Sequence, residues 1–258
     1  MFMFSRKPAY PSGPPNYRAY VIGDVHGRLD LLEQLLGRIE ADMSARKNAD
    51  IVLAFVGDLI DRGPSSAQVV ERLRNYGHEG VRTVFLLGNH EEVLLRILAG
   101  EDDLINGWLR FGGAECLRSY GEEPGEIRSL SADHALARIR AAIPEEHKTF
   151  LESFGDTFKF GDYLFVHAGV RPGVDLDSQL QKDLRWIRDP FLLHEGDHGF
   201  VVVHGHTICK EVEERPNRIG IDTGAYATGV LTALAIDQGK RWFIDTRQSA
   251  GAPIPAAH

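Results

Sequence analysis

Residues 51–63 read IVLAFVGDLIDRG, an apolar run that ends in glycine and then in charged residues. A continuous apolar run such as residues 51–56 suits a β-strand that is buried on both faces. The charged residues that follow, Asp58, Asp61 and Arg62, would then lie at the carboxyl end of that strand. This stretch predicts a buried strand with polar groups gathered where it ends.

The same arrangement occurs on both sides of this stretch. Residues 19–22 form an apolar strand pattern that runs into GDVHG at 23–27, and residues 83–87 form another that runs into GNH at 88–90. Leucines at three- and four-residue spacing predict a helix between the first two strands. Pro64 predicts a second helix, because proline is tolerated in the first helical turn. This alternation of strand and helix indicates a layered α/β fold.

The rest of the chain divides into a helical middle and a strand-rich end. The patterns between about 100 and 155 are helical, and we predict a helical cap there. Strand patterns then occur at 157–160, 163–166, 200–203, 230–236 and 241–244. We therefore predict an irregular lead-in over 1–17, a single domain over 18–247 that carries the cap, and a flexible tail over 248–258.

Composition limits the classes of function. Of 258 residues, 43% are hydrophobic and 26% are charged, which is ordinary for a soluble globular protein. The formal net charge of −8 argues against nucleic acid as a partner, because phosphate backbones select basic surfaces. Cys116 and Cys209 fit no zinc spacing and are expected to be free thiols. With no signal-like or membrane-length apolar segment, we expect a cytoplasmic protein with no membrane partner.

Side chains that bind metals end one predicted strand after another: Asp24 and His26, Asp58, Asn89 and His90, His167, and finally His204 and His206. Open α/β sheets bind ligands at the carboxyl ends of their strands, so these residues would converge in space. Carboxylate, imidazole and amide oxygen together suit divalent ions such as Mn, Fe or Zn. Two such ions about 3.5–4 Å apart, bridged by one carboxylate, would hold a hydroxide and clamp a phosphoryl group for in-line attack.

The chain resembles the phosphoprotein phosphatase (serine/threonine phosphatase) branch of the calcineurin-like metallophosphoesterases, in its bacterial and phage-type form. Five motifs carry the resemblance in the family's order: GDVHG at 23–27, GDLIDRG at 57–63, GNHE at 88–91, HAG at 167–169 and GHT at 205–207. Each motif alone has a structural explanation, such as capping a helix, but folding does not require all five in this order. The resemblance covers residues 19–245 and implies a four-layer α/β sandwich of two mixed β-sheets flanked by helices.

The resemblance also implies a role for each matching residue. Six would bind the two metal ions, with Asp58 as the bridge: Asp24, His26, Asp58, Asn89, His167 and His206. His90 would be the general acid that protonates the leaving oxygen, and Asp61 would hold its orientation. Arg62 would bind phosphate oxygens through its planar guanidinium group. Arg188 follows Trp186 by two residues and resembles the second phosphate arginine of bacterial and phage-type members.

Several other residues leave alternatives open. Tyr226 lies in a segment that resembles a family loop near the metals, so it would reach the substrate unless it has a core or turn role. His204 precedes His206 by two residues and, on an extended strand, would point to the same side as a partner of the ligands or the substrate. Residues 108–113 form either an active-site rim or a packed helix that ends at glycines. Ile208 replaces a histidine ligand of many relatives outside this branch, which favours the phosphoprotein phosphatase branch.

Together these features predict a metal-dependent phosphoesterase that hydrolyses phosphate monoesters through a metal-bridging hydroxide. The two divalent ions are expected to be Mn²⁺, with Fe or Zn as alternatives. A serine/threonine phosphoprotein or phosphopeptide is the first choice of substrate, and symmetrical cleavage of a dinucleoside tetraphosphate is the alternative. An inactive metal- or phosphate-binding module is disfavoured, because the sequence has every expected ligand, the acid and the arginine. The sequence leaves the oligomeric state open.

Overall fold

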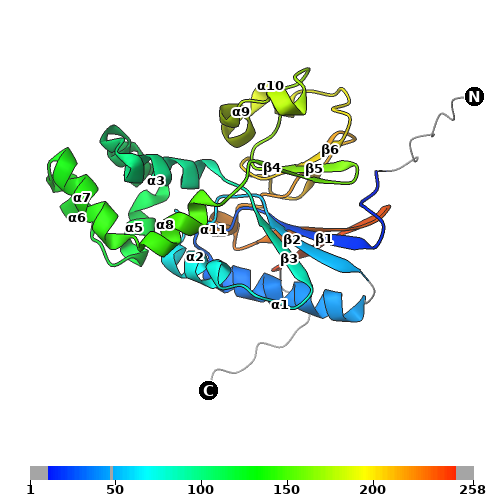
Figure 1. Ribbon diagram of the computed structural model, residues 1–258, viewed down its shortest axis with the longest axis horizontal. Coiled ribbons are helices and arrows are strands. Elements are labelled where there is room, and N and C mark those ends of the chain that lie inside the picture. Colours follow the sequence, from blue (N-terminus) through cyan, green and yellow to red (C-terminus); the bar gives the residue numbers. More distant parts are fainter. Residues whose placement is uncertain (1–10, 47–48, 248–258) are drawn as a thin grey trace, which may run out of the picture.

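Two five-stranded β-sheets pack face to face at the centre of this computed structural model, which describes residues 11–46 and 49–247 (Figure 1). The first sheet contains, in spatial order, β10 (Lys240–Asp245), β9 (Thr232–Asp237), β1 (Tyr17–Ile22), β2 (Asp50–Phe55) and β3 (Val81–Phe85). The second contains β4 (Thr157–Phe160), β5 (Tyr163–Val166), β6 (Val201–His204), β8 (Arg218–Gly220) and β7 (Glu213–Glu214).

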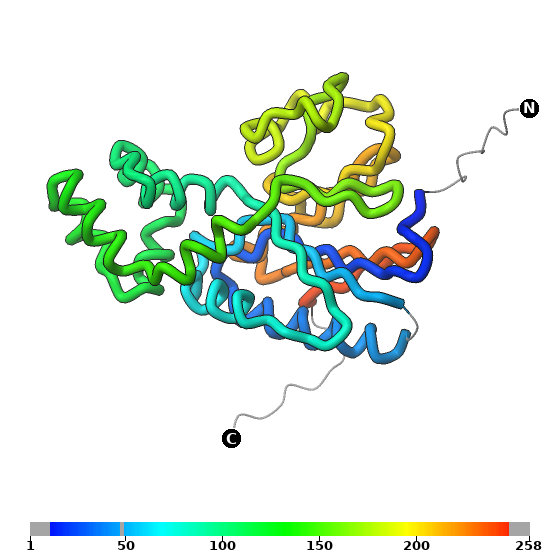
Figure 2. The backbone as a smooth tube through the Cα atoms, viewed as in Figure 1, coloured from blue at the N-terminus to red at the C-terminus, as the bar shows by residue number. Residues whose placement is uncertain are grey.

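Both sheets are mixed. Strands β1, β2 and β3 run parallel to one another, and so do β5, β6 and β8. Strands β4, β7, β9 and β10 pair antiparallel with their neighbours, and β9 pairs with β1 although more than two hundred residues separate them. Figure 2 shows this pairing as the orange-to-red C-terminal hairpin lying beside the blue strand β1. The strands that precede the predicted motifs are therefore parallel ones, and β3 among them lies at the edge of its sheet.

Alternate residues of each strand enter different cores. On β1, Val21 packs between the two sheets, whereas Tyr20 packs against helices α1 (Leu29–Ala45) and α2 (Ser66–Arg74). On β5, Phe165 packs between the sheets and Leu164 faces α9 (Gln181–Trp186) and α10 (Asp189–Leu192). Figure 1 shows α1 and α2 below the sheets and α9 and α10 above them. The predicted α/β sandwich of two mixed sheets flanked by helices is confirmed.

A run of helices follows α3 (Asn89–Ala99), which begins at the end of β3. These helices, here called the cap, are η1 (Asp102–Leu104), α4 (Ile105–Trp108), the kinked segment η2 (Leu109–Gly113), α5 (Ala114–Ser119), α6 (Pro124–Ser129), α7 (Ala132–Ala142) and α8 (Glu145–Glu152). Their apolar side chains continue the core that lies under the first sheet. Figure 1 shows the cap beside the sheets, at the left.

The structure differs from the sequence-based expectations mostly at element ends. Tyr17, placed in the lead-in, begins β1, and α2 begins at Ser66 rather than at Pro64. The short strands β7 and β8 and the helices η3 (Leu176–Ser178) and α11 (Ala225–Thr228) were not expected, because so few residues show no periodicity. The predicted tail, and residues 1–10 of the lead-in, lie outside the described residues. The boundaries of a single domain stay a prediction.

Among the described residues, no helix combines the length and the hydropathy that crossing a membrane requires.

Candidate active site

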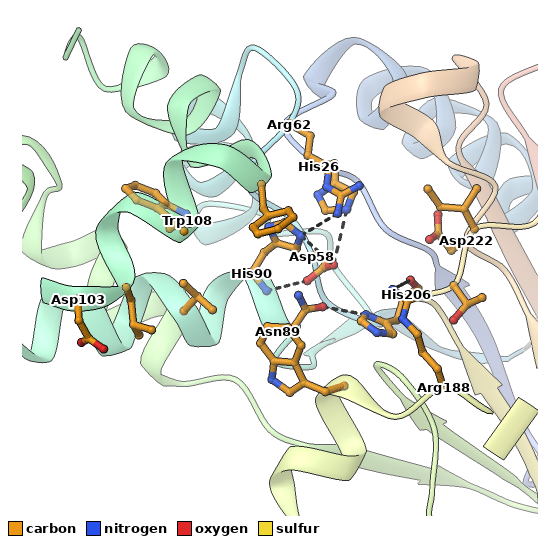
Figure 3. Close-up of a pocket in the computed structure, with 17 residues that line it drawn as sticks. His26, Asp58, Arg62, Asn89, His90, Asp103, Trp108, Arg188, His206 and Asp222 are labelled. Carbon is orange, nitrogen blue, oxygen red and sulfur yellow. Dashed lines mark hydrogen bonds and ion pairs between the residues drawn. The ribbon is translucent and has the colours of Figure 1, made fainter. Parts of the chain in front are cut away.

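The segments that follow the parallel strands meet around a cavity of about 690 Å³. His26 follows β1, Asp58 follows β2, Asn89 and His90 follow β3, and His206 follows β6, and all five side chains line the cavity. Figure 3 shows them turned toward one another around Asp58, with Trp108 on the cap side and Arg188 and Asp222 on the opposite side. Residues that are distant in the sequence are thus brought to one place.

Asp58 lies between two groups of donor atoms. Its Oδ2 is 3.6 Å from His26 Nε2, and its Oδ1 is 3.5 Å from His167 Nε2. His90 completes the first group and His206 completes the second, and the ligand atoms within each group lie within 4.8 Å of one another. A carboxylate that presents a different oxygen to each group has the arrangement needed to bridge two cations.

Backbone carbonyl groups hold the imidazoles of His26 and His167. Nδ1 of His26 donates to Ile60 O at 2.8 Å, and Nδ1 of His167 donates to Val56 O at 2.8 Å. Because a carbonyl oxygen can only accept, each Nδ1 carries the proton and each Nε2 keeps its lone pair. The lone pairs face Asp58, and fixing the tautomer in this way is typical of histidine that binds a metal.

Asn89 belongs to the second group of donors. Its Oδ1 is 2.9 Å from His167 Nε2 and 2.8 Å from His206 Nδ1. Together with Asp58, these side chains offer two oxygen and two nitrogen donors within one buried cluster. Mixed oxygen and imidazole donors suit divalent ions of intermediate hardness, such as Mn²⁺, Fe²⁺ and Zn²⁺.

Asp24 is buried beside these groups but is a member of neither. Its Oδ2 accepts a hydrogen bond from the backbone N–H of His206 at 3.0 Å. Its Oδ1 has no hydrogen-bond partner, and neither has Nε2 of His206. Leaving buried polar atoms without partners is unfavourable, and a nearby cation would satisfy them. The residues present therefore fit divalent cations.

The charges of the site also indicate that it binds cations. Burial, then the charges of Asp222 and Asp58, raise the pKa of the Asp24 carboxyl well above its usual value. Burial also raises the pKa of Asp222 to about 6. Burial lowers the pKa of His26 and of His206 to about 3, so that both imidazoles are neutral and available as ligands. Crowded carboxylates among neutral imidazoles form a site that positive charge would stabilise.

His90 and Asp61 form a buried pair on the same cavity wall. Nδ1 of His90 donates to Asp61 Oδ2 at 2.6 Å, and its Nε2 lies 3.9 Å from Asp58 Oδ2. Burial by itself lowers the pKa of His90, but the Asp58 and Asp61 carboxylates outweigh it and raise the pKa to about 9. An imidazole that keeps its proton at neutral pH beside the cavity can donate that proton to a leaving group.

Two guanidinium groups line the cavity. Arg62 approaches His90 Nε2 at 3.3 Å and donates to the hydroxyl of Tyr226 at 2.5 Å. Arg188 lies between α9 and α10, and its Nη2 is 3.5 Å from His206 O. Tyr226 thus contacts one of the two arginines, and its ring also packs on His26. Planar guanidinium groups suit the oxygen atoms of a phosphoryl group.

The backbone is strained where these side chains project. Among the described residues, the non-glycine residues with positive φ are Asn16, His26, Asp58, Asp61, Arg62, His206 and Gln238. All but the first and the last of these are predicted site residues. Side chains seldom adopt this conformation, so the surrounding structure must hold it. Gly88 allows the tight packing, because a Cβ there would lie 2.2 Å from Asp58 Oδ1.

Sequence reasoning missed two residues that build the site. Glu91 is buried, and its carboxylate accepts hydrogen bonds from backbone N–H groups of the loop after β2, including those of Asp58 and Leu59. It follows Gly88 by three residues and accepts from the Gly88 N–H, a spacing typical of helix starts that could have revealed it. Asp222 lines the cavity, and its negative charge helps to raise the pKa of Asp24; it begins the segment that resembled a family loop, in which only Tyr226 was singled out.

His204 does not lie where the strand alternation predicted. It is buried, its ring packs against Phe191 with 5.0 Å between centroids, and it does not line the cavity. The chain leaves the extended conformation after β6, since His206 has a φ of 63°, and the two side chains therefore do not share one side. The prediction that His204 points to the same side as His206 is wrong for this reason, and a contact between His204 and the substrate stays a prediction.

Comparison with known proteins agrees with this geometry. The family model described as calcineurin-like phosphoesterase matches residues 17–224. A relative from Anoxybacillus flavithermus, bis(5'-nucleosyl)-tetraphosphatase PrpE [asymmetrical], is 31% identical, over 83% of this chain and 88% of its own. The symmetrical bis(5'-nucleosyl)-tetraphosphatase of Klebsiella pneumoniae is 43% identical, over 63% of this chain and 46% of its own. Serine/threonine-protein phosphatase 1 of Salmonella typhimurium is 28% identical, over 86% and 93%.

Among solved structures, a putative diadenosine tetraphosphatase has a TM-score of 0.62 and covers 94% of this chain and 100% of its own. Its sequence identity of 22% shows the shared fold alone. The family match spans most of the chain and includes every strand that carries a predicted ligand. The chain belongs to the calcineurin-like phosphoesterase family.

Proposed function

We propose that this protein hydrolyses the phosphoanhydride chain of dinucleoside polyphosphates, using two divalent metal ions bridged by Asp58. The observation that carries this choice of substrate is the composition of the cavity. Metal donors, two arginines, Asp103 and Asp222 form its charged part, and aromatic and aliphatic side chains complete its walls. Such a division suits a substrate with a polyphosphate chain and flat, apolar bases.

The metal ions would be held by His26 and Asp58 on one side and by Asp58, Asn89, His167 and His206 on the other, with Asp24 beside them. When bound, the ions would lower the pKa of a water molecule and offset negative charge on the phosphoryl oxygens. We propose Mn²⁺ as the native ion, because the donor set mixes carboxylate and amide oxygens with imidazole, and Fe and Zn compete for the same donors.

The side chains of the chain itself supply the rest of the reaction. Arg62 and Arg188 bind phosphoryl oxygens from the cavity wall and thereby orient the reacting phosphorus. His90 donates a proton from Nε2 to the oxygen that leaves. Asp61 accepts the hydrogen bond from His90 Nδ1, which keeps the imidazole in position.

The walls support the choice of nucleotide over protein. Phe111 is 71% exposed and Trp186 is 39% exposed, and both line the cavity. Trp186 is fixed in place because its indole N–H donates to Glu92 Oε2 at 3.0 Å. Exposed aromatic rings beside a phosphate site can stack on bases. Glu92 follows Glu91 on α3. The first turn of this helix therefore binds both the loop after β2, through Glu91, and Trp186 of the cavity wall, through Glu92.

A serine/threonine phosphoprotein is the second candidate. It was the first choice from the sequence motifs, and the similarity to the Salmonella phosphatase over most of both chains keeps it in view. The metal groups and the His90–Asp61 pair would serve a phosphate monoester equally well, since they contact only the phosphoryl group and the leaving oxygen. A cytoplasmic location, without a membrane or nucleic-acid partner, belongs to either proposal.

The experiment compares two substrates with protein loaded with Mn²⁺. Diadenosine tetraphosphate is followed by separating ADP, ATP and AMP, and a phosphoserine peptide is followed by phosphate release. We expect the dinucleotide to have the higher kcat/KM, and two ADP, or ATP with AMP, identify the bond that is cleaved. Higher kcat/KM for the peptide would replace the first candidate with the second. Turnover of neither substrate by fully loaded protein would refute both.

A further inference from the structure

We propose that the cap aligns the catalytic groups of the strand-end loops. Trp108 is a positioning residue for the general acid His90, and Gly112 holds the backbone of Arg62 in place. Both contacts come from one short irregular stretch, residues 108–112. The inference rests on the proposed phosphoryl hydrolysis, in which His90 is the acid and Arg62 binds phosphate. It gives the cap a role in the reaction itself, in addition to forming a wall.

Trp108 reaches the carboxylate that holds the acid. Its indole Nε1–H lies 2.9 Å from Asp61 Oδ2 and 3.1 Å from Asp61 Oδ1. Asp61 is completely buried, and His90 Nδ1 donates to the same Oδ2 at 2.6 Å. The carboxylate therefore receives the indole N–H from the cap, which also brings the Cys116 thiol to it, and one donor from α3. Two donors from different elements fix its rotation about the side chain, and with it the direction in which His90 points.

The contact is well placed to affect catalysis. Hydrogen bonds to a buried charged group are among the stronger ones in proteins, and Asp61 has no access to water that could replace the indole. Without the indole N–H, the carboxylate can turn and carry His90 Nδ1 with it. His90 Nε2 would then leave the position from which it protonates the leaving oxygen, although the metal donors would be unaffected.

Arg62 is held by the cap a few residues later. Its backbone N–H donates to Gly112 O at 3.0 Å, and Arg62 itself has a φ of 66°. Gly112 has a φ of 118°, and a Cβ there would lie 2.6 Å from Arg62 Cγ and 2.7 Å from Arg62 N. Only glycine permits this approach. The strained backbone of the phosphate-binding arginine thus depends on a residue of the cap.

A kink in the backbone of the cap places both contacts. Within Leu109–Gly113 the chain turns between two helices, with non-helical angles at Phe111 and Gly112. Glycine adopts the positive φ of this turn without the steric cost that a side chain would add. Here the interruption turns the Gly112 carbonyl toward Arg62, while α4 directs Trp108 toward Asp61.

The test uses the dependence of the rate on the leaving group. A nitrophenolate leaves without a proton, whereas phenolate and alkoxide leave faster when an acid protonates them. In Trp108→Phe, which keeps an aromatic ring and removes the donor, we expect kcat for phenyl phosphate to fall by about ten-fold or more. For 4-nitrophenyl phosphate we expect kcat to change by less than about two-fold, with the metal content unchanged. Trp242→Phe, on the distant edge strand β10, is the matched control and should alter neither rate.

Gly112→Ala tests the second contact independently, because it should change a different kinetic parameter. Displacement of Arg62 should raise KM for both aryl phosphates by similar factors and leave the ratio of their kcat values unchanged. Gly121→Ala is its control, because Gly121 also lies in the cap region with a positive φ of 85°, but a Cβ there meets no atom within 4 Å. Any effect of backbone strain alone is thus measured separately from displacement of Arg62.

A readout that needs no turnover keeps the two proposals distinguishable. The proton on His90 Nδ1, hydrogen-bonded to a buried carboxylate, should give a downfield ¹H NMR signal that His90→Asn removes. Trp108→Phe should shift or broaden that signal, whereas Trp242→Phe should not. Inactivity of the wild-type protein toward every phosphate substrate refutes the proposed function. An unchanged signal in Trp108→Phe, or an equal loss of rate on both aryl phosphates, overturns the inference about the cap.

Discussion

The strand-end loops and the cap meet at the same cavity, but they are built in different ways. The loops hold their donors on a strained backbone, with positive φ at His26, Asp58 and His206. The cap consists of short helices whose apolar faces join the core beneath the first sheet, and it reaches the site through Trp108 and Gly112. The chemistry of the reaction restricts the loops to a few residue types, whereas packing lets many sequences build a cap. We therefore expect the loops to carry what the family shares and the cap to carry what differs.

The largest expected effect comes from the carboxylate at the centre of the loops. In Asp58→Asn, an uncharged amide replaces the carboxylate that lies between the two donor groups, and one of its two oxygen atoms is lost. We expect the metal content to fall and kcat to fall by at least roughly a thousand-fold, because several kcal/mol of electrostatic stabilisation are lost. Elemental analysis and steady-state rates measure both. Asp133→Asn, an exposed carboxylate on the cap helix α7, is the control and should keep metal and activity.

The next effect separates the acid from the metals. His90→Asn should reduce kcat by about 10²–10⁴-fold for substrates with poor leaving groups, since general acids contribute that much. The protein should still bind its full complement of metal, because His90, whose pKa is raised to about 9, keeps its proton at neutral pH and is then not a ligand. His134→Asn, an exposed histidine of the cap, provides the comparison. Unchanged turnover in His90→Asn would remove His90 from the mechanism.

Sequence motifs predicted the loops better than the cap for a physical reason. Ligand types follow from metal chemistry and their positions from strand ends, so Asp58, Asn89 and His167 could be placed from residue type and spacing. His204 was misplaced because the turn after β6 breaks the alternation that the prediction assumed. The sequence could not decide whether Trp108 belongs to the rim of the active site or to the packed core, because an indole suits either place. Only the fold brings its N–H to Asp61. Glu92 and Trp186 lie far apart in sequence, and no local sequence pattern predicts their hydrogen bond.

Removing the metal should change how stability depends on pH. In the metal-free protein, burial raises the pKa of Asp222 from 3.8 to about 6, so the folded state binds its proton more tightly than the unfolded state. The contribution of Asp222 to the free energy of unfolding should therefore decrease as pH rises from about 4 to 6, opposite in sign to the contributions of His26 and His206, whose pKa values are lowered to about 3. Mn²⁺ should remove this loss and raise Tm, because it binds only the folded site. Thermal unfolding of the wild type and of Asp222→Asn, each with and without chelator, isolates this contribution, and a metal-free wild type that gains stability relative to Asp222→Asn over this pH range would contradict the account.

The smallest effect tests the wall rather than the reaction. Trp186→Ala should raise KM for diadenosine tetraphosphate by roughly ten-fold, since stacking of a base on an aromatic ring contributes about 1–3 kcal/mol. It should leave KM for a small aryl phosphate within about two-fold, because that substrate has no base to stack. Steady-state kinetics on both substrates give the comparison. Equal increases would mean that Trp186 acts on the phosphate site, through Arg188, and not on a base.

One measurement tests the central claim most directly. Crystals grown with Mn²⁺ and measured at the manganese absorption edge should give two anomalous peaks per chain, about 3.5–4 Å apart. We expect one oxygen of Asp58 to coordinate each peak, with His26 on one side and Asn89, His167 and His206 on the other. A single fully occupied peak, or two peaks that share no ligand, would contradict the bridging role of Asp58.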